Sequence, residues 1–569
     1  HLGSVYRDSG DEQHAAASYE DAIKEADRLQ VAEVRWQARN ELGVLLGSER
    51  YFSEAIDLLE EHQNEIALAE LRPNVLAAAV MWRNPYDDYI DFLLRQNRAA
   101  DAFFIAERER GREFLKSLSE SHDAFTPEER QLVGRIKTAQ AVLRSATVSD
   151  AKRADVVASI GRYESELSDL RLKLAVDHPS LAHARYPKLL HAAGVQSQLL
   201  APDEALIAFY LGAKQSVAWV ITRESLRTIL LPAARDIDVR PVIAALRNPE
   251  SRDRESIAAL SRALQMDALL SAAGKQRVIV IPHGVLYDVP FEALVDAKGR
   301  MVVERCAVSY APSASSLAFL RSSPHAANAP VSLIAVANPI VGAHEAAMLR
   351  QIDLAHVNLL SPLPRTSEEA RDIGAAVILE GANATRSQLA RLSDARVIHF
   401  ATHGLIDEER PDRSGLVLTA DPPHDDGLLQ VRDIYALHLN ADLVTLSACD
   451  TALGQNVTGE GIVGLTRAFF FAGARSVVAS LWDVEDAATA RLMQRFYTNL
   501  DDGQPIDVAL QHAKLDFVRS GASPFFWASF VASGNARPSI ATADRSDRIR
   551  AAMVLVTIAA LAYFAIVKL

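Results

Sequence analysis

The sequence predicts an all-α solenoid, then an α/β sandwich with a largely parallel central sheet, and finally a transmembrane helix. A helical spacing of small, large and aromatic residues recurs over about the first 110 residues. From about Leu199 the pattern changes to short apolar runs separated by helical stretches, as in alternating strands and helices. The segment 551–567 carries no charge, which predicts the terminal helix.

The composition narrows the class of protein. The chain has 569 residues, 49% of them hydrophobic, so it is long enough to form several cores. It carries 73 acidic and 60 basic residues, a net charge of -13, and no basic run interleaved with aromatic residues, so we expect no nucleic acid partner. The two cysteines, Cys306 and Cys449, exclude a disulfide framework and a four-cysteine zinc site, and favour a reducing compartment.

Residues 1–120 are predicted to form tetratricopeptide-like repeats, in which small residues lie where helices cross closely and larger ones fill the space between pairs. Three copies of the pattern use Leu2, Gly3, Tyr6, Ala15, Tyr19 and Ala22, then Leu42, Gly43, Leu46, Ala55 and Leu59, then Ile90, Ala99, Phe103 and Ala106. An ordinary helical bundle is the alternative. A solenoid presents a concave face, so we expect it to bind a protein or peptide partner. His1 already lies within helical pattern, which suggests that the natural start is missing.

A helical hairpin is predicted to link the two parts, over residues 121–198. Thr126, Pro127 and Glu129 supply a capping hydroxyl, a proline and a glutamate at the positions that begin a helix. Two charged amphipathic helices follow, at about 127–146 and 149–174.

The α/β region is predicted to cover residues 199–535. Its expected strands are 205–210, 216–222, 278–281, 333–336, 397–401, 443–447, 477–481 and 526–531, with helices between most of them. In a parallel sheet, catalytic groups belong at the carboxyl ends of strands. His403 and Cys449 occupy that position on two successive strands.

A thiol and an imidazole at neighbouring strand ends predict a cysteine nucleophile and its base. Cys449 needs this activation because a free thiol is mostly protonated at neutral pH, and His403 would take its proton. The backbone amides of Gly404 and Cys449 would stabilise the oxyanion that forms on an attacked carbonyl. A buried, inert cysteine is the alternative for Cys449.

Acidic residues follow two of the predicted strands. Asp450 comes next to Cys449, and Asp483, Glu485 and Asp486 follow the strand 477–481. They could form a pocket for a lysine or arginine side chain of a substrate. Equally, the last three could be the acids that favour a helix N-terminus.

Two other kinds of site are disfavoured, and no cofactor or metal is expected. His399 lies on a predicted strand that leads to His403, and in extended chain four residues separate the two by roughly 13 Å, too far for a metal pair. The segment 459–464 matches a dinucleotide-binding glycine pattern, with Asp483 at a suitable distance, but it does not leave a strand directly. Its glycines are better explained by close packing of the next helix.

Several separate blocks of the α/β region share a further pattern. They are Val280-Ile281-Pro282-His283-Gly284 with Leu286, Pro290, Phe291, Glu292 and Leu294; Ser309-Tyr310-Ala311-Pro312-Ser313; Leu363-Pro364 with Glu368, Glu369, Ala384 and Thr385; His399 to Gly404; Ser447 to Thr451; the glycine segment; Ala472-Gly473-Ala474; and Trp482-Asp483-Val484. Together they resemble the CHAT family, peptidases of the caspase and separase clan.

This resemblance implies a caspase-like fold with a His403 and Cys449 dyad. The segment 481–484 is also similar to a separase segment near a pocket for a basic residue, although Glu485 replaces the threonine found there. Repeat domains joined to such peptidases recur in bacterial defence and programmed cell death, where the repeats detect a trigger or hold the substrate.

The segment 551–567 is expected to anchor the chain in a membrane after a polar linker, 536–550. Arg545, Arg548 and Arg550 precede it and Lys568 follows, a bias that places the peptidase domain on the cytoplasmic side. A buried core helix is the alternative. The leading hypothesis is thus a membrane-anchored cysteine endopeptidase that cleaves a protein partner. The alternative is a scaffold whose peptidase-like domain only transmits partner binding.

Overall fold

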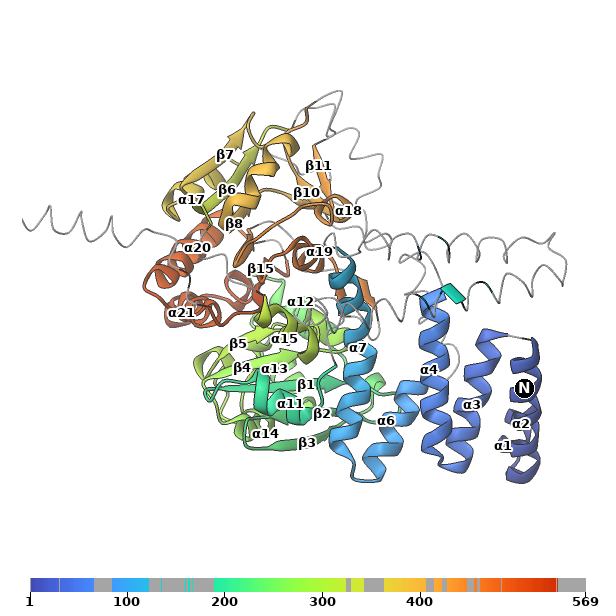
Figure 1. Ribbon diagram of the computed structural model, residues 1–569. Helices are drawn as coiled ribbons and strands as arrows, with labels where there is room; N and C mark the ends of the chain where they lie inside the picture. The colour runs from blue at the N-terminus through green and yellow to red at the C-terminus, as the bar shows by residue number, and fades with distance from the viewer. Residues whose placement is uncertain are drawn as a thin grey trace, which may run out of the picture.

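A computed structural model of the chain shows a row of paired helices beside a long α/β sheet (Figure 1). The structure describes residues 2–29, 31–65, 84–121, 189–323, 329–341, 363–405, 414–421, 427–447, 455–457, 461–482, 484–538 and 540, with 132, 135, 159, 162, 163 and 166. Most of the predicted hairpin over 121–198 lies outside these residues. The predicted domain boundaries stay predictions.

The N-terminal helices are tetratricopeptide-like repeats, as their spacing predicts. The pairs are α1 (Leu2–Asp8) with α2 (Glu12–Leu29), α3 (Ala32–Leu46) with α4 (Glu49–Glu65), and α6 (Pro85–Arg95) with α7 (Ala99–Ser121). A Cβ atom on Gly3 would lie 2.7 Å from the ring of Tyr19, and one on Gly43 would lie 3.1 Å from that of Phe52. Glycine therefore lets both pairs cross closely.

The central sheet has eleven described strands in the order β3-β2-β1-β4-β5-β16-β15-β12-β8-β6-β7. Their bounds are β1 Glu204–Tyr210, β2 Ser216–Ile221, β3 Leu226–Leu231, β4 Arg277–Ile281, β5 Ala307–Tyr310, β6 Val331–Pro339, β7 Val377–Gly381, β8 Ala395–Ala401, β12 Leu443–Leu446, β15 Ser476–Ser480 and β16 Phe530–Gly534. Most neighbours are parallel; the antiparallel pairs are β1 with β2, β2 with β3, and β15 with β16. Buried apolar residues fill the strands between the two edges, as expected for a sheet covered on both faces, whereas the edge strands β3 and β7 are only partly buried.

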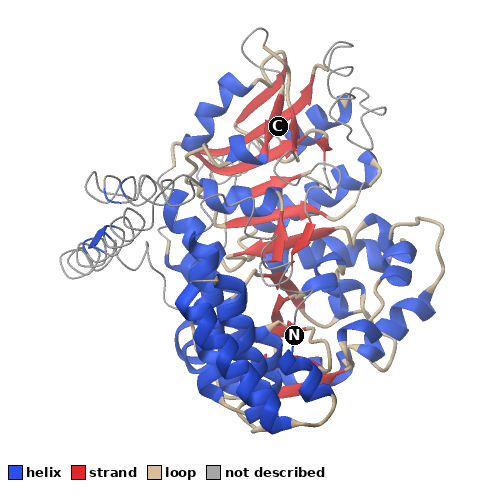
Figure 2. Cartoon of the chain, turned by 90° about the vertical axis from the view of Figure 1, so that its right-hand side faces the viewer, coloured by secondary structure: helices blue, strands red, loops and turns tan. Residues whose placement is uncertain are grey.

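Helices cover both faces of this sheet (Figures 1 and 2). They include α12 Arg240–Leu246, α13 Arg254–Ala263, α14 Met266–Ala273, α15 Ala314–Ser322, α17 Pro364–Asp372, α18 Val431–Ile434, α19 Leu465–Ala472, α20 Asp486–Asp501 and α21 Ile506–Arg519. The repeats meet the sheet through α7, which contacts α15 and α19.

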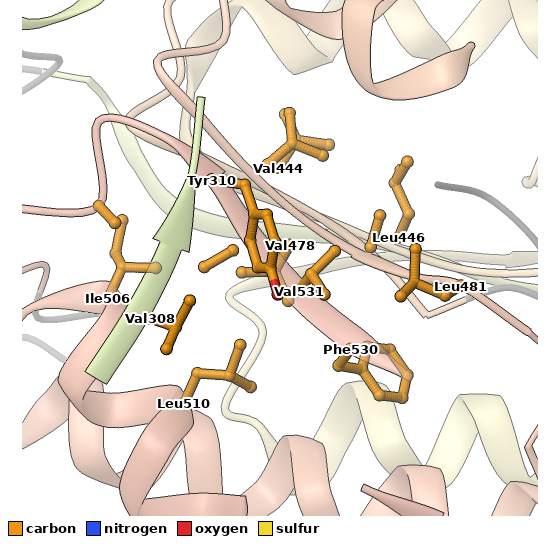
Figure 3. Close-up of a cluster of buried hydrophobic side chains, with 14 of the residues drawn as sticks. Val308, Tyr310, Val444, Leu446, Val478, Leu481, Ile506, Leu510, Phe530 and Val531 are labelled. Atoms are coloured by element: carbon orange, nitrogen blue, oxygen red, sulfur yellow. The ribbon is translucent and has the colours of Figure 1, made fainter. Parts of the chain in front are cut away.

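The sheet has two halves. The first half is β3-β2-β1-β4-β5 and the second half is β16-β15-β12-β8-β6-β7. They meet where β5 pairs with β16 at Tyr310 and Ser533. Figure 3 shows Val308 of β5 beside Ile506 and Leu510 of α21, with side chains of the second half around them, so one core continues across the joint.

The predicted membrane helix requires a correction. The segment 551–567 lies outside the described residues, and within the described ranges no helix is both long and apolar enough to cross a membrane. The long helices α2 and α7 carry acidic and basic side chains along their length. The fold class is therefore corrected to a mixed α/β fold with a helical N-terminal region. The predicted membrane localisation, a tail anchor with a cytoplasm-facing peptidase domain, is wrong on the same finding.

Candidate active site

His403 lies directly after the carboxyl end of β8 and before a small second sheet. That sheet consists of β9 (Gly404–Leu405), β10 (Gly415–Val417) and β11 (Leu428–Gln430). The carbonyl of His403 accepts a hydrogen bond of 2.9 Å from the amide of Val417. The neighbouring Thr402 hydroxyl donates to the carbonyl of Val417. The backbone of the partly buried His403 is therefore held between two sheets.

The strand that leads to Cys449 is the immediate neighbour of β8. β12 and β8 run parallel, with Thr445 opposite His399 and Leu446 opposite Phe400. The amide of Ser447 continues this ladder with a 2.8 Å hydrogen bond to the carbonyl of Phe400. Cys449 itself lies outside the described residues. The structure thus places His403 and the approach to Cys449 at the ends of adjacent parallel strands.

The acidic residues follow the next strand of the sheet. β15 is the parallel neighbour of β12 on the side opposite to β8. Glu485 and Asp486 are exposed at the N-terminus of α20, whereas Asp450 and Asp483 lie outside the described residues. The exposed pair suits the helix-end interpretation. The substrate pocket stays a prediction.

His399 is a core residue. Its Nε2 atom lies 2.9 Å from a carboxylate oxygen of Glu369 on α17, and its Nδ1 atom lies 3.1 Å from the hydroxyl of Tyr497 on α20. The Tyr497 hydroxyl also donates to Thr445 on β12 at 2.9 Å. Sequence reasoning placed His399 in a strand near the site but missed this network. Tyr497 is far from both strands in the sequence, so no local spacing could predict that it contacts His399 and Thr445.

The glycine-rich segment belongs to a hairpin. β13 (Gln455–Val457) pairs antiparallel with β14 (Gly461–Val463), and α19 begins directly afterwards at Leu465. A dinucleotide loop would connect a strand of the parallel sheet directly to a helix. The surroundings therefore do not match a nucleotide site.

The second cysteine differs from the candidate nucleophile. Cys306 is 3% exposed and precedes β5. Burial raises the pKa of its thiol to about 12, with a smaller opposing effect of the Arg305 charge. At neutral pH it stays protonated and unreactive.

Comparison with known proteins identifies a domain in this region. The CHAT domain family matches residues 254–535. Tetratricopeptide repeat protein 28 from Mus musculus is 29% identical, over 46% of this chain and 12% of that protein. The Homo sapiens protein of that name is 28% identical with the same coverage. The matched region is therefore a small part of these relatives.

Two solved structures are similar to this chain at low identity. The Saccharomyces cerevisiae separase–securin complex has a TM-score of 0.36 and 10% identity, and covers 92% of this chain and 51% of the other. The complex of Porphyromonas gingivalis RgpB pro- and mature domains has a TM-score of 0.31 and 12% identity, with coverages of 55% and 78%.

Proposed function

The chain carries a CHAT domain over residues 254–535, and from this premise we infer that it is a cysteine endopeptidase that cleaves a protein substrate. The observation that carries the inference is the direct pairing of β8 with β12, because it brings the residues after both strands to one edge of the sheet. His403 would be the base and Cys449 the nucleophile.

The reaction follows from these two groups. His403 takes the thiol proton, and the thiolate of Cys449 attacks the carbonyl carbon of the scissile peptide bond. The intermediate collapses to a thioester as the amine leaves with the proton from His403. Water, deprotonated by His403, then attacks the thioester, and the carboxylic acid product and the protonated thiol are released.

The orientation of Gly404 supports its proposed part in binding the oxyanion. In an antiparallel ladder, hydrogen-bonded and non-hydrogen-bonded pairs alternate. The amide of Val417 donates to the carbonyl of His403, so the next pair, Gly404 with Leu416, is of the non-bonded kind. The amide of Gly404 therefore points away from β10, on the outer side of β9. The amide of Cys449 would be the second donor.

The acidic residues are proposed as the substrate pocket. Glu485, Asp486, Asp450 and Asp483 follow β12 and β15, next to the proposed nucleophile in strand order. Their negative charge would favour an arginine or lysine before the scissile bond.

The repeats are proposed as a sensor or docking arm for a protein or peptide, in a system such as bacterial defence or cell death. The contacts of α7 support this role. It packs against α15 of the first half and against α19, the helix that follows the segment after Cys449. A partner bound to the repeats would therefore act close to the candidate site.

Covalent labelling tests the peptidase proposal. We expect a biotinylated peptidyl chloromethyl ketone with arginine at its reactive end to label the parent chain, and the Cys449→Ala and His403→Asn variants to lose the label. Cys306→Ala is the matched control and should keep it, because its thiol is buried. If the parent reacts no faster than Cys449→Ala, the peptidase proposal fails. The scaffold alternative would then gain support from a partner that the chain binds without cutting.

A further inference from the structure

A chain of buried hydrogen bonds lies beneath the two strands of the candidate site. It runs from Glu369 on α17 to His399 on β8, then to Tyr497 on α20 and Thr445 on β12, with separations of 2.9, 3.1 and 2.9 Å. His399 and Thr445 are also direct partners in the strand register. The network therefore joins both strands to the helices α17 and α20.

The four side chains are withdrawn from water. His399 and Thr445 are fully buried, Tyr497 is 1% exposed and Glu369 is 3% exposed. Burial raises the pKa of Tyr497 far above its ordinary value, so its hydroxyl keeps the proton that it donates to Thr445. Each group in such a place must be dehydrated, and apolar side chains of similar volume often stabilise a core as well or better. What hydrogen bonds add is direction, because they hold their partners in one geometry.

The network lies four residues before His403 and Cys449 on their two strands, so it can affect the distance between them. His403 and Cys449 each lie four positions after a residue of the network, His403 after His399 and Cys449 after Thr445. The two network residues are themselves paired across the strands. The two strands stay in register up to Phe400 and Ser447. Any shift of β8 against β12 at the network would therefore be passed on to the residues that follow both strands.

We propose that Tyr497 is a positioning residue that, through His399 and Thr445, holds the His403 and Cys449 segments in reactive alignment. The inference rests on the proposed peptidase function. Glu369 fixes the imidazole of His399 from the opposite side, so that its Nδ1 atom faces the tyrosine hydroxyl. A reacting group displaced by about 1 Å loses up to roughly 100-fold in rate, so a small shift is sufficient.

The test measures the reactivity of Cys449 in the full chain. Iodoacetamide is added across a range of pH, and mass spectrometry follows the modified peptide. Cys306 is buried and serves as an internal standard for unfolding. In the parent, the Cys449 thiol should titrate below the value of about 8.5 that is normal for free cysteine. In Tyr497→Phe, the titration should move toward that value, with alkylation at pH 7 roughly tenfold slower.

Tyr310→Phe is the matched control. It also removes one buried hydroxyl of the same sheet, that of Tyr310 on β5, which lies 2.5 Å from a carboxylate oxygen of Glu292. It should lower the melting temperature about as much as Tyr497→Phe and leave the Cys449 titration unchanged. Thr445→Val removes only the hydrogen bond between Tyr497 and Thr445, so it should move the Cys449 titration in the same direction as Tyr497→Phe. The double variant should go no further than Tyr497→Phe, because that variant already removes this hydrogen bond.

The outcomes separate the two proposals. If the parent titrates as a free thiol, the dyad of the proposed function fails, and this inference fails with it. If the Cys449 thiol titrates below the free value in the parent and at the same pH in Tyr497→Phe, the dyad is supported and the positioning role is overturned. An equal shift in Tyr310→Phe would also overturn that role, because it would reflect a general loss of stability.

Discussion

The buried polar groups of the two halves of the sheet make different connections. In the first half, buried charges join the sheet to the repeats: Glu107 of α7 accepts hydrogen bonds from the amides of Ala314 and Ser315, at 3.1 and 3.0 Å. In the second half, the buried network around Tyr497 joins strand to strand beneath the candidate site. Holding the repeats and aligning the site are therefore expected to be separable, and each can be disturbed by itself.

Buried ion pairs bridge the joint between the halves. Lys514 of α21 lies 2.7 Å from a carboxylate oxygen of Glu292, and Arg277 of β4 lies 2.8 Å from Asp507 of α21. These four side chains are all nearly inaccessible to solvent. Because the strands share so short a ladder at β5 and β16, α21 carries much of the connection.

The largest effect of a single replacement should come from breaking this joint. Replacing Lys514 with methionine leaves the Glu292 carboxylate buried without its cation, which typically costs about 3–5 kcal/mol of unfolding free energy. Urea denaturation would measure the loss. Lys514→Met combined with Glu292→Gln should recover much of it, since no unpaired charge remains. Equal losses in the single and double variants would show that the ion pair does not hold the joint.

The sequence predicted the second half better than the first. The strands that hold His399 and Thr445 were found because continuous apolar runs end at polar residues. β3 was missed because it is only partly buried and carries Arg227 and Thr228. The strand expected at 526–531 begins at Phe530, because Ser523 and Pro524 start a short 3-10 helix over Pro524–Phe526.

The candidate site shows the same limit. His403 and Gly404 were predicted from a local motif, and the strand expected before them at 397–401 is confirmed as β8, whereas the short strand β9 that begins at Gly404 was not predicted. The partners of His399 come from α17 and α20, and no local pattern reports such contacts. The positions of Cys449, Asp450 and Asp483 lie outside the described residues and stay predictions.

A second large effect should be a dependence of stability on pH, caused by two buried carboxyl groups of the repeats. Burial raises the pKa of Asp87 on α6 to about 6, with a smaller effect of the Asp88 charge, and burial raises the pKa of Glu109 on α7 to about 7, with a smaller effect of the Asp87 charge. A carboxyl group whose pKa is raised by folding stabilises the fold below its unfolded pKa and loses that contribution as pH rises through the folded value. The unfolding free energy should therefore fall between about pH 4 and pH 7, by on the order of 5 kcal/mol.

The matched variant replaces these acids with their neutral isosteres, Asp87→Asn and Glu109→Gln. Asp88, Arg110 and Lys214 stay in place nearby, so the variant changes only the two titrating groups. Chemical denaturation at several pH values should show a smaller loss of stability in the variant than in the parent. Identical pH profiles would mean that these carboxyl groups do not control how the repeats are held.

The smallest effect compares two caps on one helix. α15 is capped locally by Ser313, whose hydroxyl accepts from the amide of Ser316 at 3.0 Å, and from the repeats by Glu107. Ser313→Ala and Glu107→Gln should each lower the unfolding free energy by about 1 kcal/mol.

Hydrogen exchange distinguishes the two variants, because only Glu107→Gln removes a contact between α7 and the first half. That variant should lose amide protection in both α7 and α15, whereas Ser313→Ala should lose it in α15 alone. If α7 keeps full protection in Glu107→Gln, the repeats are held mainly by apolar contacts, such as that of Phe103 with Trp219, and the comparison between the halves must be redrawn on packing rather than charge.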